Sequence, residues 1–176
     1  MQKIGAVEIH FQPTIIFNME ILFSNQKINN KKFDSIIERY VLENNKLVEL
    51  NTSDLVDLFS SISKYWASDI CKIKHIFLNY EMGFLIAWLK KKNLNNLLKI
   101  NFNDLDVLDM PNLNSKDKYF IAKPQGIALH WLAGNVPVLG VISLFQSLLT
   151  KNKSIIKVPM NFKTVLPDIL NDLKKN

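Results

Sequence analysis

Cysteine is nearly absent from this chain, whose 176 residues include a single thiol at Cys71. One cysteine excludes an internal disulfide, and a chain of this size without one is typical of a reducing compartment. Cys71 lies on a predicted apolar helix, which favours a buried structural thiol over a nucleophile. The N-terminal residues also lack the uninterrupted apolar stretch of a signal peptide. Together these features predict a cytoplasmic protein.

Arginine occurs once, at Arg39, although lysine and arginine together number 22 and the formal net charge is +6. Such a charge is found in proteins that bind nucleic acid, membrane surfaces or phosphorylated cofactors. The basic residues are scattered and no nucleic-acid recognition motif accompanies them, so we do not expect nucleic-acid binding. His10, His75 and His130 show no metal-ligand spacing, and His130 on a predicted buried strand is expected to be a core histidine. No metal site is predicted.

Charged residues are missing from Pro124–Leu149, which a hydropathy window would flag as a membrane span. Gly134 and Pro137 divide this stretch into two pieces that are each too short to cross a bilayer as a helix. His130 and Gln146 would also need polar partners in lipid. A buried strand followed by a buried helix explains the same residues better, and a membrane-associated protein remains the weakest alternative.

The first 115 residues predict a mixed α+β region. Apolar residues recur there at helical spacing, and runs rich in β-branched and aromatic residues indicate strands. The expected elements are strands at 5–11 and 14–23, helices at 35–44, 52–66, 69–91 and 93–98, and a connecting loop at 101–118.

The pattern changes after residue 115, where short apolar strands alternate with helices. The expected elements are strands at 119–122, 127–132 and 154–158, and helices at 137–150 and 164–175. This order is typical of a βαβ unit in a parallel sheet. The chain is therefore predicted to be α/β, with an α+β region at 1–115. Residues 116–176 are expected to begin a doubly wound, Rossmann-like nucleotide-binding unit that is incomplete.

The turn at Gly134–Asn135 carries the chemistry that the sequence suggests. It follows a buried strand and precedes a helix with Pro137 in its first turn, and ligands bind at this edge of an open α/β sheet. Gly134 allows a close approach of the backbone to a ligand, and the first helical N–H groups favour an anion. Asn135 adds an amide donor suited to a developing oxyanion. The alternative is that Asn135 caps the helix, and the sequence alone leaves both open.

The run from Pro124 to Pro159, PQGIALHWLAGNVPVLGVISLFQSLLTKNKSIIKVP, resembles the aldehyde dehydrogenase superfamily and is most similar to the LuxC-type acyl-CoA reductases. Those enzymes share a Pro-x-Gly strand, a Gly-Asn-Val-Pro turn, a helix, a Lys-Asn turn and a strand ending in Ile-Lys or Val-Lys. All of these features occur here in order. Residues before 115 add only a compatible length and helix content, so the resemblance covers the N-terminal portion of such an enzyme.

This resemblance implies an aldehyde-dehydrogenase-like fold and specific residue roles. Asn135 matches the asparagine that stabilises the thiohemiacetal oxyanion, while Leu132, Ala133 and Gly134 match the turn along the dinucleotide. Lys157 matches the lysine that contacts the adenosine ribose or its 2′-phosphate, which favours NADPH. Family members reduce acyl-CoA to fatty aldehyde through a cysteine thioester, and the resemblance suggests an acyl-protein synthetase as a partner.

The chain departs from the family pattern at three points. Met160 replaces a ribose-binding glutamate of many aldehyde dehydrogenases, and Lys151 stands where many relatives have glycine. No cysteine follows Asn135, so the nucleophile is expected beyond this chain, and the chain alone is expected to be inactive. The alternative is a non-catalytic module that dimerises or pairs with a separate C-terminal half.

Overall fold

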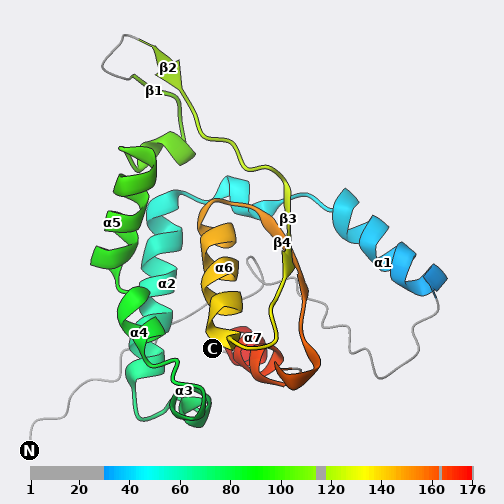
Figure 1. Ribbon diagram of the computed structural model, residues 1–176. Helices are drawn as coiled ribbons and strands as arrows, with labels where there is room; N and C mark the ends of the chain where they lie inside the picture. The colour runs from blue at the N-terminus through cyan, green and yellow to red at the C-terminus, as the bar shows by residue number, and fades with distance from the viewer. Residues whose placement is uncertain (1–29, 114–117, 163, 176) are drawn as a thin grey trace, which may run out of the picture.

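The computed structural model describes residues 30–113, 118–162 and 164–175 (Figure 1). The strands predicted at 5–11 and 14–23 lie outside these residues. The helices are α1 (Asn30–Leu42), α2 (Thr52–Ala67), α3 (Lys74–Asn79), α4 (Phe84–Trp88), α5 (Lys91–Phe102), α6 (Pro137–Leu149) and α7 (Val165–Lys175). Short 3₁₀ turns occur at η1 (Lys46–Glu49), η2 (Asp106–Leu108) and η3 (Met160–Phe162). The strands are β1 (Asn112–Leu113), β2 (Tyr119–Phe120), β3 (Ile127–Trp131) and β4 (Lys153–Lys157).

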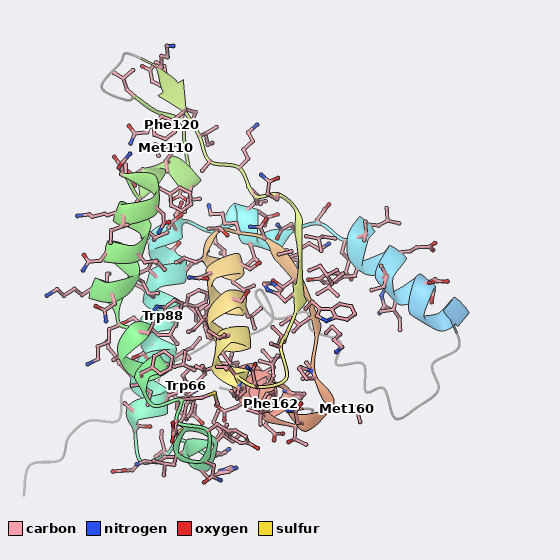
Figure 2. All side chains as sticks on the ribbon, in the orientation of Figure 1. Trp66, Trp88, Met110, Phe120, Met160 and Phe162 are labelled. Atoms are coloured by element: carbon pink, nitrogen blue, oxygen red, sulfur yellow. The ribbon has the colours of Figure 1, made fainter. Side chains whose placement is uncertain are left out.

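Helix α2 organises the hydrophobic core, because it contacts α4, α5 and α6 (Figure 1). Its predicted apolar stripe is confirmed, since Leu55, Phe59 and Trp66 are almost fully buried. The Phe59 and Phe145 ring centroids lie 4.8 Å apart in an edge-on arrangement, and Trp66 packs on Phe77 at the same distance (Trp66 is labelled in Figure 2). Aromatic contacts of this kind add to the stabilisation from area burial.

The single helix predicted at 69–91 is wrong, because the chain breaks there into α3 and α4. Glu81 adopts a left-handed conformation with φ 53°, and the Met82 N–H donates to the Phe77 carbonyl at 2.9 Å. This six-to-one bond around a left-handed residue is a Schellman motif, which ends a helix. Met82 is consequently buried, whereas Tyr80 and Phe84 of the expected stripe are exposed.

The segment after α4 also differs from expectation. The short helix predicted at 93–98 is part of the longer α5. The loop predicted at 101–118 contains the end of α5, the turn η2 and strand β1. β1 pairs antiparallel with β2, and this hairpin projects from the helices in Figure 1. β1 lies in the segment whose composition predicts a loop, so the sequence did not reveal this strand or its pairing with β2.

The βαβ unit predicted after residue 115 is confirmed by β3, α6 and β4. The two strands are parallel and in register from the Ile127–Lys153 pair to the Trp131–Lys157 pair. α6 packs against both strands, and α7 packs against α6 (Figure 1). Within the described parts of the chain this sheet has two strands. The wider doubly wound arrangement stays a prediction.

One core joins the residues on both sides of position 115. Phe59 and Trp66 of α2, Phe145 of α6 and Ile169 of α7 belong to the same buried cluster. The predicted division at 115 therefore marks a change in the order of elements, and whether it separates domains stays a prediction. In the ranges 30–113, 118–162 and 164–175, no helix is long and apolar enough to cross a bilayer.

Candidate functional site

The carboxyl ends of β3 and β4 lie side by side, because parallel strands end at the same edge of a sheet. The Leu132 N–H donates to the Lys157 carbonyl at 3.3 Å, which brings two predicted cofactor-binding residues together. Lys157 is exposed, and its Nζ lies 4.9 Å from the centroid of the Trp131 ring. Trp131 is itself 76% exposed. This edge therefore presents an ammonium group that lies over an exposed aromatic ring.

The first turn of α6 packs closely against the end of β3. Gly140 is buried in that helix, and a Cβ built on it would lie 2.5 Å from Cδ1 of Leu132. A larger residue would force the Leu132 side chain or α6 itself to shift. Glycine at position 140 thus lets the start of the helix approach the strand that leads into the predicted site.

In the turn between β3 and α6, the residues Ala133, Gly134 and Asn135 are exposed. The structure does not support helix capping by Asn135, because the N-cap position of α6 is Val136 and has no side-chain cap. Among the described residues, the Asn135 carboxamide has no hydrogen-bond partner. The chain thus places an open amide beside the helix N-terminus, and its role in catalysis stays a prediction.

Asn161 is a residue of this site that the sequence did not indicate. It lies in η3, just after β4, and its Nδ2 donates a hydrogen bond to the carbonyl of Gly134. A Cβ on Gly134 would lie 3.2 Å from Oδ1 of Asn161, so the missing side chain makes room for this contact. An asparagine in a short turn has many ordinary uses, and no spacing rule connects it with Gly134.

His130 lies on β3, and its ring forms hydrogen bonds with serine hydroxyl groups of the neighbouring elements. Its Nδ1 is 2.7 Å from Oγ of Ser143 on α6, and its Nε2 is 3.2 Å from Oγ of Ser154 on β4. Ser154 in turn donates to Ser147 at 2.9 Å. The expectation of a core histidine is confirmed, because the ring is buried and has partners at both nitrogens.

Lowering the pH should destabilise the fold through His130. Burial lowers the pKa of this imidazole, so the unfolded chain, with a pKa near 6.5, takes up the proton first. The stabilisation is complete above about pH 6.5 and is lost as the pH falls toward the folded-state pKa, by up to ~1.4 kcal/mol per pH unit. Urea unfolding at several pH values measures this slope. His130→Gln should flatten it, whereas substitution of the exposed His75 should not; an equal slope in both variants contradicts the assignment.

Lys151 occupies the tight turn between α6 and β4 with a left-handed backbone, φ 60°. Glycine accepts this conformation most readily, and glycine is the residue that the family pattern led us to expect here. The lysine side chain is buried, and its Nζ lies 2.5 Å from Oδ1 of Asp109. Asp109 also accepts hydrogen bonds from the N–H and hydroxyl of Thr52. Burial by itself raises the pKa of the Asp109 carboxyl, but the bonds from Lys151 and Thr52 outweigh it, so its pKa is lowered.

Cys71 is buried, as predicted. Burial raises the pKa of its thiol, which opposes formation of the nucleophilic thiolate. Over the described ranges, no group of three or more histidine, cysteine, aspartate or glutamate residues is placed to hold a metal ion.

Comparison with known proteins identifies the family. A family model described as acyl-CoA reductase (LuxC) matches residues 47–176. A long-chain acyl-protein thioester reductase of Aliivibrio fischeri is 33% identical over 126 residues, which cover 62% of this chain and 26% of the relative. One from Photobacterium phosphoreum is 32% identical over 145 residues, covering 74% and 28%. One from Photorhabdus luminescens is 25% identical over 168 residues, covering 87% and 35%.

The chain thus spans about a quarter to a third of the length of these relatives. The family model extends over most of the chain, including α2, the βαβ unit and α7. The family resemblance inferred from the Gly-Asn-Val-Pro turn and its flanking strands is therefore confirmed. The chain belongs to the acyl-CoA reductase (LuxC) family.

Proposed function

We propose that this chain forms the oxyanion donor and part of the cofactor site of an NADPH-dependent reductase that converts a long-chain acyl thioester to an aldehyde. The supporting observation is the shared edge where β3, β4 and the N-terminus of α6 meet, with Asn135 and Lys157 both exposed there. The relatives are named as reductases of acyl-protein thioesters, which supports a thioester substrate, acyl-CoA or acyl-protein. The proposed fold is aldehyde-dehydrogenase-like.

The residues at this edge fit an anionic dinucleotide. The first N–H groups of α6 lack intrahelical partners, and the helix dipole favours phosphate there. Leu132 leads into the turn, Ala133 and Gly134 leave the backbone of the turn without bulky side chains, and Lys157 offers a cation for a 2′-phosphate. When bound, NADPH supplies the hydride.

Asn135 has a different role in the proposed reaction. Attack of a cysteine thiolate on the acyl carbon forms a new C–S bond and develops negative charge on the carbonyl oxygen. Collapse of this intermediate expels the thiolate of CoA or of the acyl-protein and leaves the acyl group as a thioester on the cysteine. A neutral amide held at a fixed place stabilises that oxyanion without having to reorganise. Because Cys71 is buried with a raised pKa, the nucleophile in this proposal is a cysteine outside the 176 residues.

The direct test is aldehyde formation by the complete protein from long-chain acyl-CoA and NADPH, measured by NADPH absorbance and by mass spectrometry of the aldehyde. We expect one NADPH to be consumed and one CoA thiol to be released for each aldehyde formed. The 176-residue chain alone should form no aldehyde. Aldehyde produced by the chain alone would contradict a nucleophile outside it, and a complete protein that forms none from acyl-CoA or acyl-protein would contradict the proposed function.

Replacing Lys157 with glutamine should weaken NADPH binding roughly 10- to 100-fold, because a hydrogen bond to a charged group contributes about 1.5–3 kcal/mol. NADH lacks the 2′-phosphate, so its binding should change by less than about threefold. Calorimetric titration of the complete protein measures both affinities. Lys92→Gln is the matched control, since Lys92 is an exposed lysine on α5. Equal losses for NADPH and NADH would show that Lys157 does not contact the 2′-phosphate.

Association with a further polypeptide segment is a second proposal, and the outer face of β3 supports it. Leu129 and Trp131 are 68% and 76% exposed on this strand. Apolar side chains gathered on a strand of a two-stranded sheet favour contact with another chain or segment. Light scattering of the purified chain distinguishes a monomer from a homo-oligomer, and co-expression with a C-terminal segment tests pairing. A chain that stays monomeric and binds no such segment would exclude this proposal.

A further inference from the structure

Asn161 contacts the Gly134–Asn135 turn from a separate element. It lies in η3, 27 residues after Gly134, and its carboxamide makes one hydrogen bond to that glycine. Nδ2 donates to the Gly134 carbonyl oxygen, and Oδ1 and Nδ2 lie 3.2 Å and 3.5 Å from the position of a Cβ on Gly134. Asn161 therefore holds the Gly134 carbonyl and occupies the space that a side chain at position 134 would need.

Holding this carbonyl fixes the direction of the next backbone donor. The carbonyl of Gly134 and the N–H of Asn135 belong to one peptide plane, and the described part of the chain has no cis peptide bonds. In a trans peptide the C=O and N–H point in opposite directions. A bond from Asn161 to the carbonyl therefore turns the Asn135 N–H away from η3.

Without that bond the turn would be loosely held on its N-terminal side. Glycine populates a wide range of backbone conformations, so Gly134 by itself does not determine the peptide orientation. On the C-terminal side a constraint is already present, because Pro137 disfavours the helical conformation for Val136, which has φ −138° and ψ 89°. The contact from Asn161 supplies the constraint that the glycine lacks.

We propose that Asn161 is a positioning residue, which aims the backbone N–H and the carboxamide of Asn135 by holding the Gly134 carbonyl. This inference rests on the proposed function, because it assigns a purpose to the orientation of Asn135. Asn161 acts through the turn and does not contact the substrate. Its loss should thus reduce the rate of the chemical step and leave cofactor binding nearly unchanged.

The orientation of the Asn135 amide can be observed directly. Gly134–Asn135 is the only Gly-Asn step in the 176 residues. Labelling glycine with ¹³C at the carbonyl and asparagine with ¹⁵N therefore gives one carbonyl-coupled amide signal from this chain. Asn161→Ala and Asn161→Asp should both shift that signal, since the first removes the donor and the second places a carboxylate against the carbonyl oxygen. Asn161→Gln keeps the donor and should restore part of the native shift.

Kinetics of the complete protein provide the second readout. Asn161→Ala should lower kcat roughly two- to tenfold, in proportion to one hydrogen bond, with the KM for NADPH unchanged. Asn96→Ala is the matched control, because Asn96 is an exposed asparagine on α5, away from the turn. Thermal unfolding of each variant measures any loss of stability.

The outcomes separate this inference from the function on which it rests. An unshifted Asn135 signal and an unchanged kcat in Asn161→Ala would overturn the positioning role, and so would equal effects in Asn96→Ala. A raised KM with an unchanged kcat would also overturn it. If the wild-type protein reduces no acyl thioester, the proposed function fails, while the shift of the amide signal still shows whether Asn161 sets the orientation of the turn.

Discussion

Replacing Asp109 with alanine should lower the free energy of unfolding by about 3–5 kcal/mol, because it removes one partner of a buried ion pair. The Lys151 side chain is only 4% exposed, and its ammonium would be left in the core without its carboxylate. The same substitution removes the acceptor for the N–H and hydroxyl of Thr52 at the start of α2. Urea unfolding followed by circular dichroism measures the loss.

Two further variants make this measurement specific. Asp106→Ala removes an exposed aspartate from the same segment and should change stability by at most about 0.5 kcal/mol. Lys151→Gly combined with Asp109→Ala removes the unpaired charge and also gives the left-handed position a residue that accepts it. The double variant should therefore be more stable than Asp109→Ala alone. A loss in Asp109→Ala no larger than in Asp106→Ala would show that the pair contributes little.

The pair between Asp109 and Lys151 shows where prediction from sequence stops. Asp109 belongs to a segment that the sequence predicts as a loop, and the only feature that distinguishes Lys151 in the sequence is its departure from the family pattern. The two residues are 42 positions apart, and neither has a spacing or motif that connects it with the other. The structure supplies the reason for the unusual lysine, since its side chain reaches a carboxylate that a glycine could not contact.

The βαβ unit was predicted well because its signals are local. Short apolar strands, Pro137 at the first helical turn and the polar turn at 151–153 each restrict the backbone where they occur. The buried, hydrogen-bonded state of His130 followed from its place on an apolar strand. These features need no knowledge of distant residues.

The prediction of one helix at 69–91 was wrong because the break in this segment depends on contacts with distant residues. Its apolar stripe matched helical periodicity, but the left-handed Glu81 and the Schellman bond from Met82 to Phe77 end α3 within it. Glutamate is a good helix former, so propensity did not mark the break. Burial of Met82 against the core offsets the cost of the left-handed residue, and such a tertiary gain is invisible to a periodicity count. The contact of Asn161 with the Gly134 turn was not predicted for a similar reason, because the two residues are 27 positions apart.

Replacing Asn135 with alanine should lower kcat of the complete protein about 10²- to 10³-fold, the usual cost of losing one oxyanion donor. The carboxamide is exposed and makes no hydrogen bond within the described parts of the chain, so the fold should lose little stability. Single-turnover reduction of acyl-CoA with excess NADPH measures the chemical step. Asn135→Asp keeps the shape but puts a negative charge at the developing oxyanion, so it should be at least as slow.

Stability and rate together decide between the two roles considered for Asn135. Loss of a helix cap lowers stability by about 1 kcal/mol and has little direct effect on chemistry. Loss of an oxyanion donor lowers the rate and leaves the unfolding transition in place. Asn96→Ala, an exposed asparagine on α5, controls for the substitution itself and should change neither quantity. A kcat within about threefold of wild type in Asn135→Ala would remove the oxyanion role, because a donor at the reacting oxygen stabilises the transition state by much more than that.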